Sequence, residues 1–151
     1  MKALLQRVSE AAVTVRGGTL ASIPRGLFVL IAVAADDSPQ DAHRLAHKIL
    51  SIRLFDHPDT AKPWSQSVTD INGHLLCVSQ FTLHALTHKS PTPDFHRAMN
   101  AAAAKVLYDL VLTCLAEKLP SNVKHGLFGE YMQCSLTNDG PVTVEIDTKR
   151  T

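Results

Sequence analysis

The chain has 151 residues, is 45% apolar, and carries 15 Lys and Arg against 14 Asp and Glu. This length and composition predict one domain, residues 1–151, that buries a continuous core without metal or disulfide staples. Because the charges nearly cancel, no global field draws the chain onto long nucleic acid or an anionic membrane. No apolar run after Met1 is long enough for a signal peptide or a membrane span, so we expect a soluble, cytoplasmic protein without a membrane partner.

Residues 2–23 alternate apolar and polar side chains around a turn signal, Gly17-Gly18, which predicts a hairpin with one buried face. Residues 26–34, "GLFVLIAVA", are apolar throughout. A strand of this kind is covered on both faces, so another layer of structure is expected on each side.

A helix is predicted next, because Ser38, Pro39 and Asp41 supply an N-cap, a first-turn proline and an early acid. Its apolar residues recur at helical spacing, as an amphipathic helix packed on a sheet requires: Ala42, Leu45, Ala46 and Ile49. Residues 56–73, with two prolines and the single Trp, then predict a long loop or a loose hairpin.

The second half begins with a predicted strand at 74–81 and irregular chain at 84–95. The strongest helix signal covers residues 100–119, with Asn100 as the cap and Pro120 beyond the end. Its apolar stripe is predicted to run through Val106, Leu110, Cys114 and Leu115. Two further strands, 130–137 and 142–147, are predicted on either side of Gly140-Pro141. This order predicts a layered α/β fold with a mixed β-sheet and two main helices.

Cys77, Cys114 and Cys134 are widely spaced in apolar surroundings, which predicts reduced core thiols and neither a disulfide framework nor a metal site. His84 and His88 stand four residues apart, a spacing that suits zinc on a helix. The third ligand and the flanking glutamate of such a motif are missing, so we interpret both as loop histidines. No metal and no cofactor are predicted.

The stretch "SQFTL", residues 79–83, places hydroxyl and amide side chains where a strand ends, and small-molecule sites often form at such ends. By composition alone, a strand end whose hydroxyls satisfy loose backbone groups is the simpler interpretation. No GxSxG elbow surrounds Ser79, so a serine hydrolase is weakly supported. Residues 138–141, taken alone, indicate an ordinary β-turn.

Taken together, "VSQFTL" (78–83), "NDGPVT" (138–143) and "LLQRVSEAAVTV" (4–15) closely resemble the D-aminoacyl-tRNA deacylase family, and the resemblance runs the whole length of the chain. It implies a homodimeric enzyme that hydrolyses the ester between a D-amino acid and the 3′-terminal adenosine of tRNA. The partners would be the 3′ end of aminoacyl-tRNA and a second copy of the chain.

The resemblance further implies a cis peptide bond at Gly140-Pro141, within a loop that reaches into the other subunit's active site. There it would act as a chiral filter, because Gly140 has no Cβ and a rigid backbone edge would meet an L side chain. Glycine, being achiral, would pass. Asn138 belongs to the same motif, and Arg7 would hold the loop by hydrogen bonds to its backbone.

On the opposite side of the expected site, the substrate carbonyl and ribose would lie against Ser79, Gln80, Phe81 and Thr82. The backbone N–H of Phe81 would stabilise the oxyanion, and Met132 would line the adenine pocket. Two mechanisms remain open: Thr82 as the nucleophile, or a water positioned by the 2′-hydroxyl of the tRNA itself. We favour the second, because no base is apparent beside Thr82.

The loop at 84–95 departs from the family pattern, with Lys89 as its only firm positive charge before Arg97. Few cations near the acceptor end predict a shallow salt dependence of tRNA binding. A competing hypothesis is a nucleic-acid-binding or interaction module that has kept the fold without catalysis.

Overall fold

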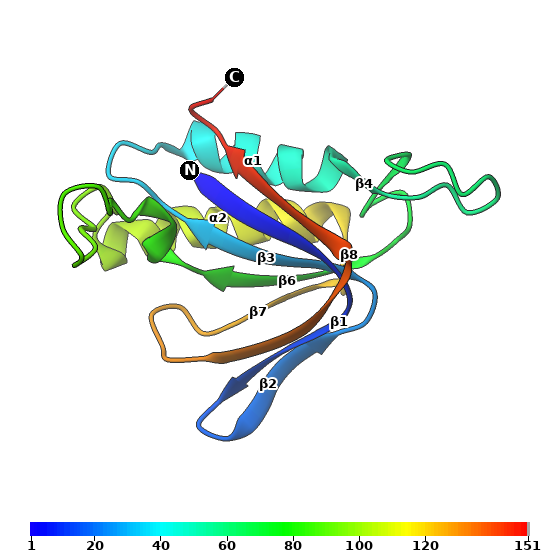
Figure 1. Cartoon of the computed structure of the whole chain (residues 1–151), viewed down its shortest axis with the longest axis horizontal. Helices are drawn as coiled ribbons and strands as arrows, with labels where there is room; N and C mark the ends of the chain where they lie inside the picture. The colour runs from blue at the N-terminus through cyan, green and yellow to red at the C-terminus, as the bar shows by residue number, and fades with distance from the viewer. Residues whose placement is uncertain (151) are drawn as a thin grey trace.

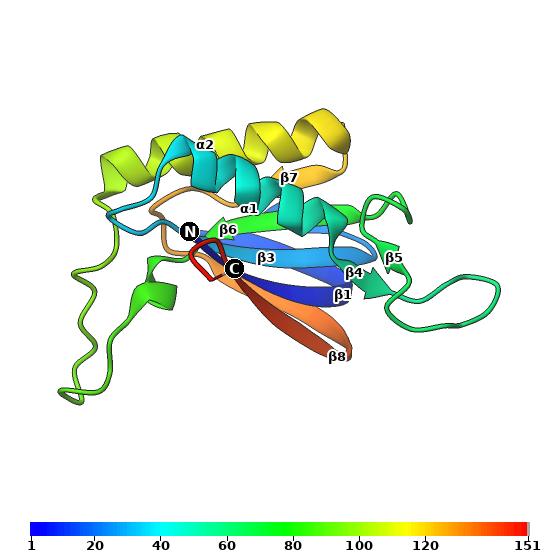
Figure 2. The ribbon, with the colours of Figure 1, turned by 90° about the horizontal axis from the view of Figure 1, so that it is seen from above.

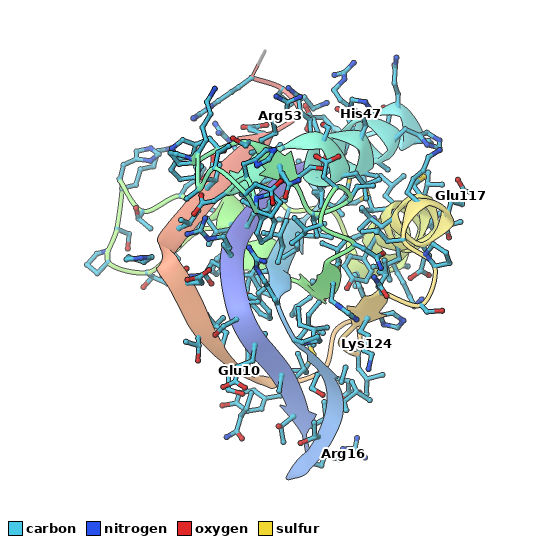
Figure 3. The ribbon with its side chains drawn as sticks, turned by 90° about the vertical axis from the view of Figure 1, so that its right-hand side faces the viewer. Glu10, Arg16, His47, Arg53, Glu117 and Lys124 are labelled. Atoms are coloured by element: carbon cyan, nitrogen blue, oxygen red, sulfur yellow. The ribbon has the colours of Figure 1, made fainter. Side chains whose placement is uncertain are left out.

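The computed structural model describes residues 1–150, and its main feature is a six-stranded mixed sheet in the order β2-β1-β3-β6-β7, with β8 also paired to β1. Both helices, α1 and α2, lie on the same side of this sheet (Figures 1 and 2). Figure 3 shows the same layering from the side. The predicted layered α/β fold with a mixed sheet is therefore confirmed. Thr151, the last residue of the predicted domain, lies outside the described residues.

The N-terminal hairpin consists of β1 (Lys2–Val15) and β2 (Gly18–Ile23), paired antiparallel. Arg16 and Gly17 have φ values of 50° and 82°, so both central positions adopt the left-handed conformation that two-residue hairpin turns need. The predicted hairpin is confirmed, with its turn at Arg16-Gly17, one residue before the predicted Gly17-Gly18.

The centre of the sheet is the apolar strand β3 (Gly26–Ala32), antiparallel to β1 and parallel to β6 (His74–Ser79). Leu27 and Val29 face the helices within the larger core cluster, whereas Phe28 lies in a second cluster with residues of β1, β2 and β6. Both faces of β3 are therefore covered, as its unbroken apolar sequence predicts. β6 also pairs with a short parallel strand, β7 (Val123–His125), which the sequence pattern did not predict.

Helix α1 (Pro39–Ser51) buries the predicted face, formed by Ala42, Leu45, Ala46 and Ile49. Its N-terminus is fixed by Asp41, whose Oδ2 accepts hydrogen bonds from the N–H of Ser38 at 3.0 Å and from its hydroxyl at 2.9 Å. After α1, β4 (Arg53–Phe55) and β5 (Gln66–Ser67) form a small two-stranded sheet with a long connection. The expected loose hairpin is confirmed.

Helix α2 (Ala101–Lys118) begins at its predicted cap, because Asn100 Oδ1 accepts a hydrogen bond from the N–H of Ala103 at 3.0 Å. The predicted apolar stripe is wrong at Val106, which is 68% exposed. The face that packs on α1 and the sheet is rotated by one position and contains Ala104, Leu107, Tyr108, Val111 and Leu115. An alanine-rich first turn leaves several faces apolar, so packing decides which of them is buried.

The C-terminal segment forms one long strand, β8 (Gln133–Asp147), where two strands were predicted. β1 pairs with β8 both before and after Gly140-Pro141: Val8 lies opposite Asn138 and Gln6 lies opposite Thr143. Residues 139–142 bulge out of the ladder between these pairs. A bulge lets the strand continue past a residue that cannot donate a hydrogen bond, which explains the difference.

The prediction of three core thiols is correct only for Cys77, which is fully buried, since Cys114 is half-buried and Cys134 is exposed. Cys134 lies on β8, which has only β1 as a paired neighbour within residues 1–150, so apolar sequence around it does not guarantee a covering layer. All three are free thiols. Neither helix within residues 1–150 is long and apolar enough to cross a membrane.

Candidate active site

A pocket of about 620 Å³ opens where β6 ends, between the short 3-10 helix η1 (Phe81–His84), the start of α2 and the segment that leads into β8. Ser79, Gln80 and Phe81 line it, together with Met132. The structure thus brings together four of the five residues that the sequence predicted for this side of the site. Thr82 follows directly but does not line the pocket.

Backbone geometry gives one wall of the pocket free hydrogen-bond donors. The N–H of Gln80 donates to the carbonyl of Ile31 at 2.7 Å, which ends the β3–β6 ladder. Phe81 and Thr82 then form the first turn of η1, where no preceding helical carbonyl can accept from their N–H groups. Among the hydrogen bonds of residues 1–150, none uses these two donors. Adjacent free N–H groups beside a pocket can bind an oxyanion.

Two polar side chains at this wall, Gln80 and Thr82, fix each other's position. Gln80 Nε2 donates to Thr82 Oγ1 at 2.6 Å, so the amide of Gln80 occupies one acceptor position of the threonine hydroxyl. No titratable group accepts a proton from Thr82 among the hydrogen bonds of the part of the chain that the structure describes. The threonine therefore has an ordering partner and no base.

The floor of the pocket is apolar and aromatic. The Phe81 ring is 56% exposed and meets Phe95 edge to face, with ring centroids 5.1 Å apart. Tyr108 packs on Phe128 at 5.5 Å and donates its hydroxyl to the buried carbonyl of Cys77 at 3.1 Å. Burial raises the pKa of Tyr108 well above its ordinary value, so the phenol stays protonated. Such a floor suits a flat ring or an apolar side chain.

Sequence reasoning missed most of the other lining residues, among them Phe95, Glu130 and Tyr131. They come from irregular segments, whose sequences have no periodicity from which the direction of a side chain could be predicted. Glu130 matters most, because its carboxylate is a titratable group on the pocket wall. It is about half exposed and lies 4.0 Å from Arg16 Nη2.

The second predicted motif forms the bulge of β8. The Gly140-Pro141 peptide bond is cis, as the family resemblance predicts. Gly140 has a φ of 141°, and a Cβ there would approach Val142 Cγ2 within 2.7 Å, so only glycine fits. Asn138 ties the two ends of the bulge together: its Oδ1 accepts from the N–H of Val142 at 3.0 Å, and its Nδ2 donates to Thr143 Oγ1 at 3.0 Å.

Arg7 makes the predicted hydrogen bond to the backbone of this bulge. Its Nε donates to the carbonyl of Asp139 at 2.9 Å, and its Nη1 donates to the carbonyl of Leu54 at 2.7 Å. Only 13% of the Arg7 side chain is exposed, and the carboxylates of Asp56 and Asp139 lie within 4 Å of its nitrogens. The guanidinium therefore links β1, β4 and the bulge.

Within one chain the two predicted halves of the site do not meet. Arg7, beside the bulge, lies opposite Leu27, and Leu27 lies opposite Leu75, four residues before Ser79. At a rise of about 3.3 Å per residue, the bulge and the pocket are separated by about 13 Å along the strands alone. No residue of the bulge lines the pocket.

The two histidines considered as zinc ligands have different environments. His84 is buried, and its Nε2 has no hydrogen-bond partner within residues 1–150, whereas His88 is exposed on the loop. Burial lowers the pKa of His84, with a hydrogen bond to the carbonyl of Ala32 acting in the opposite direction. No group of three or more potential metal ligands occurs in the part of the chain that the structure describes.

The fold and the pocket define a class of protein: an α/β domain with a small-molecule-sized site at the end of a parallel strand. A family model described as D-Tyr-tRNA(Tyr) deacylase matches residues 4–147, so the chain belongs to the D-Tyr-tRNA(Tyr) deacylase family. The chain is 45% identical to the "D-aminoacyl-tRNA deacylase" of Schizosaccharomyces pombe over 150 residues, covering 99% of both chains. It is 43% identical to the "D-aminoacyl-tRNA deacylase 1" of Bos taurus, covering 98% of this chain and 70% of the bovine protein.

Two solved structures are also similar. That of a "c-Myc DNA Unwinding Element Binding Protein" superposes with a TM-score of 0.93 at 42% identity, covering 97% of this chain and 98% of that one. That of a "probable eukaryotic D-amino acid tRNA deacylase" has a TM-score of 0.85 at 18% identity, covering 96% of this chain and 97% of that one. The second likeness is a likeness of fold alone.

Proposed function

We propose that this protein hydrolyses the ester bond between a D-amino acid and the 3′-terminal adenosine of tRNA, releasing the free amino acid and tRNA. The observation that carries the proposal is the pocket of about 620 Å³ lined by Ser79, Gln80 and Phe81, with the free backbone N–H groups of Phe81 and the adjacent Thr82 at its edge. Family membership and the names of the relatives support the same activity.

In the proposed reaction, the ester carbonyl oxygen lies near the N–H groups of Phe81 and Thr82. A water attacks the carbonyl carbon, and the negative charge that develops on the oxygen is stabilised by these donors. The bond to the ribose 3′-oxygen then breaks, and that oxygen takes up the proton lost by the water. The neighbouring 2′-hydroxyl is placed to position the water and relay this proton. Adenine lies on the apolar floor beside Met132.

The active protein is proposed to be a homodimer in which the Gly140-Pro141 bulge of one subunit closes the pocket of the other. The separation of the bulge from its own pocket supports this arrangement. Its backbone edge would exclude an L side chain by contact while leaving a D side chain in open space. Glycyl-tRNA, with no side chain to collide, would also be hydrolysed. Since the substrate is aminoacyl-tRNA, we place the proposed activity in the cytoplasm.

The deciding experiment compares release of labelled tyrosine from D-Tyr-tRNA and L-Tyr-tRNA by the purified protein, with spontaneous hydrolysis subtracted. We expect turnover of the D-substrate and little of the L-substrate. Equal turnover of both would contradict the filter. No turnover of either would favour the competing hypothesis, a nucleic-acid-binding module. Its specific support is the likeness to the "c-Myc DNA Unwinding Element Binding Protein".

A further inference from the structure

Two grooves continue from the pocket across the surface of the chain. The first, of about 470 Å³, shares a wall with the pocket, because Ala34 pairs with Ala98 between them. The second, of about 740 Å³, lies between α1 and the end of β8. Asp147 lines both grooves, and residues 147–150 form the boundary between them. The pocket, the first groove and the second groove are therefore adjacent in that order, and we call this succession the path.

Positive charge is concentrated along this path. Six of the 15 Lys and Arg of the chain line the two grooves, against three of the 14 Asp and Glu, namely Asp36, Glu145 and Asp147. We call these cations the basic track: Lys2, Arg44, Lys48, Arg97, Lys149 and Arg150. Two further carboxylates, Asp37 and Asp41, are buried behind the grooves and pair with some of these cations, so the ion pairs decide how much positive charge is left.

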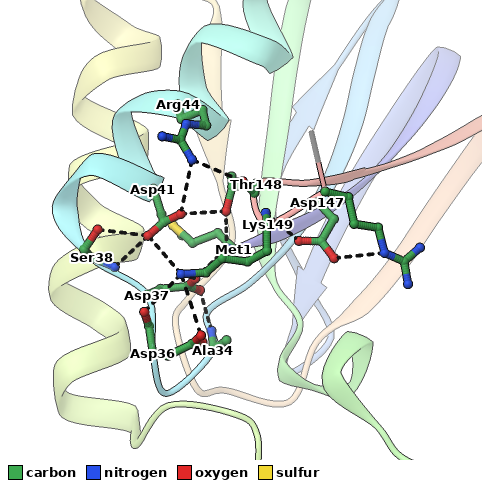
Figure 4. A network of polar contacts seen from close by, with 11 residues as sticks. Met1, Ala34, Asp36, Asp37, Ser38, Asp41, Arg44, Asp147, Thr148 and Lys149 are labelled. Atoms are coloured by element: carbon green, nitrogen blue, oxygen red, sulfur yellow. Dashed lines mark hydrogen bonds and ion pairs between the residues drawn. The ribbon is translucent and has the colours of Figure 1, made fainter.

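The cations of the track are available to a ligand to different degrees. Lys149 is held among carboxylates, 3.4 Å from Asp41 and 3.6 Å from Asp37 (Figure 4). Three other cations have one carboxylate neighbour each: Lys2 lies 3.4 Å from Glu145, Arg44 lies 4.0 Å from Asp41, and Arg150 lies 3.6 Å from Asp147. Within residues 1–150, neither Lys48 nor Arg97 takes part in an ion pair, and both are exposed. Lys48 and Arg97 therefore mark the two ends of the track with unneutralised charge.

We propose that the basic track binds the sugar-phosphate backbone of the tRNA acceptor arm as it leaves the pocket. The inference rests on the proposed function, because the pocket then fixes where the 3′ end lies. From that point the single-stranded end would pass Arg97 and the first groove, and the double-stranded stem would follow the second groove past Arg44 and Lys48. A path of concave grooves suits a narrow polyanion, whereas a lipid surface is planar and contacts a protruding face.

The track also revises the expected salt dependence. The loop at 84–95 holds few cations, which alone predicts a shallow slope. With phosphate contacts along the track, the slope of log affinity against log salt should become steeper by about 0.7–0.9 for each contact.

The test uses Lys48→Glu, with Lys118→Glu as the matched control. Both lysines are exposed in the last turn of a helix, but Lys118 lines neither groove. Affinity for uncharged full-length tRNA is titrated at several salt concentrations, and hydrolysis is followed on a D-aminoacylated CCA trinucleotide. We expect Lys48→Glu to weaken tRNA binding by about fivefold to tenfold at low salt, and to flatten the slope. Lys118→Glu should do neither. Melting temperatures establish that both variants fold.

Arg97→Glu tests the other end of the track and should weaken tRNA binding with a similar loss of slope. Equal effects of Lys48→Glu and Lys118→Glu on tRNA binding would overturn the proposal. The proposal would also be overturned if Lys48→Glu reduced hydrolysis of the trinucleotide by as large a factor as it weakened tRNA binding. A third contrary outcome is that the parent protein binds phosphatidylserine vesicles while its binding to tRNA does not depend on Lys48. Failure of the parent protein to hydrolyse D-Tyr-tRNA, with Lys48-dependent tRNA binding intact, would refute the proposed function and leave the track standing.

Discussion

Arg7 donates a hydrogen bond from Nε to the carbonyl oxygen of Asp139 at 2.9 Å, so the first strand of the chain holds the loop that carries Gly140-Pro141. The same guanidinium donates to the carbonyl of Leu54. Two carbonyls from distant parts of the chain therefore share one rigid, planar donor. Lysine has a single flexible ammonium group and cannot reproduce this geometry.

Arg7→Lys is predicted to loosen the bulge while leaving the fold intact. Loss of one charge-assisted hydrogen bond should lower the free energy of unfolding by about 1.5–3 kcal/mol. If the bulge excludes L-substrates, the ratio of D to L deacylation rates should fall as its backbone gains freedom. The measurement is that ratio at matched concentrations of folded protein.

Arg16→Lys is the control for this change, because the Arg16 side chain is 86% exposed and its one carboxylate neighbour within residues 1–150 is 4.0 Å away. It should alter neither stability nor the D-to-L ratio. A ratio that stays constant in Arg7→Lys, despite the loss of stability, would show that the position of the bulge does not set chirality.

Assembly of the site from two subunits predicts complementation. Ser79→Phe should fill the pocket, and Gly140→Ala should distort the bulge, because a Cβ would clash with Val142. Each variant alone is expected to be inactive. An equal mixture, allowed to exchange subunits, should regain about a quarter of the parental activity, since half of the dimers are mixed and each has one intact site.

Native mass spectrometry on the same mixture establishes how much heterodimer forms. Heterodimers without recovered activity would mean that both motifs serve the site of a single chain. Monomers that hydrolyse D-Tyr-tRNA would contradict the dimer itself.

Asp41 is predicted to carry the acid sensitivity of the fold. Burial alone would raise the pKa of its carboxyl, but hydrogen bonds from Thr148 and Ser38 lower the pKa below its ordinary value. The stabilisation from ionised Asp41 is therefore complete above the unfolded pKa of about 3.9, and it is lost as the pH falls below that value. Asp41→Asn should cost about 2–4 kcal/mol at neutral pH.

Denaturant unfolding at several pH values checks this prediction. The difference between the parent and Asp41→Asn should shrink as the pH falls from about 5 towards 3. Asp36→Asn serves as the control, because the Asp36 side chain is 78% exposed, and its effect should stay within about 0.5 kcal/mol. A constant difference across the pH range would mean that Asp41 stabilises the fold without regard to its charge.

Local signals explain which parts of the fold could be predicted. The first hairpin, β3 and α1 are specified by turn residues, unbroken apolar runs and caps that act over a few positions. Val106 was misplaced on the buried face of α2 because the partner of that helix, and not its own pattern, selects the face. The continuity of β8 was missed because only the pairing with β1 reveals that the bulge interrupts no strand.

The same distinction holds for the candidate site. For residues 79–81 the pattern alone favoured an ordinary strand end, and the prediction that they line a site came from the family resemblance, which a contiguous motif makes visible. Phe95 and Glu130 were missed because each lies in irregular chain, and they meet residues 79–81 only through the tertiary fold. The basic track was invisible for the same reason, since its cations come from both termini, α1 and the segment before α2.

The last prediction concerns the group that activates the attacking water. Thr82 accepts a hydrogen bond from Gln80 and has no base as partner within residues 1–150, so Thr82→Ala should retain measurable turnover. A tRNA ending in 2′-deoxyadenosine should lose most of its turnover, because the 2′-hydroxyl positions the water. An inactive Thr82→Ala that still folds and binds substrate would restore the nucleophile mechanism.

Glu130 is the alternative base, because its carboxylate lines the pocket. Removal of a general base typically costs about 10² to 10⁴-fold in rate, so Glu130→Gln separates the two possibilities. If the 2′-hydroxyl activates the water, we expect Glu130→Gln to change kcat for the D-substrate by less than about threefold. The dependence of kcat on pH should then stay the same as in the parent protein. A loss of about 100-fold or more, with unchanged substrate binding, would assign the base to Glu130. The 2′-deoxy substrate and Glu130→Gln should then be combined: if the effect of the combination is no larger than that of the 2′-deoxy substrate alone, the hydroxyl and the carboxylate act through the same water.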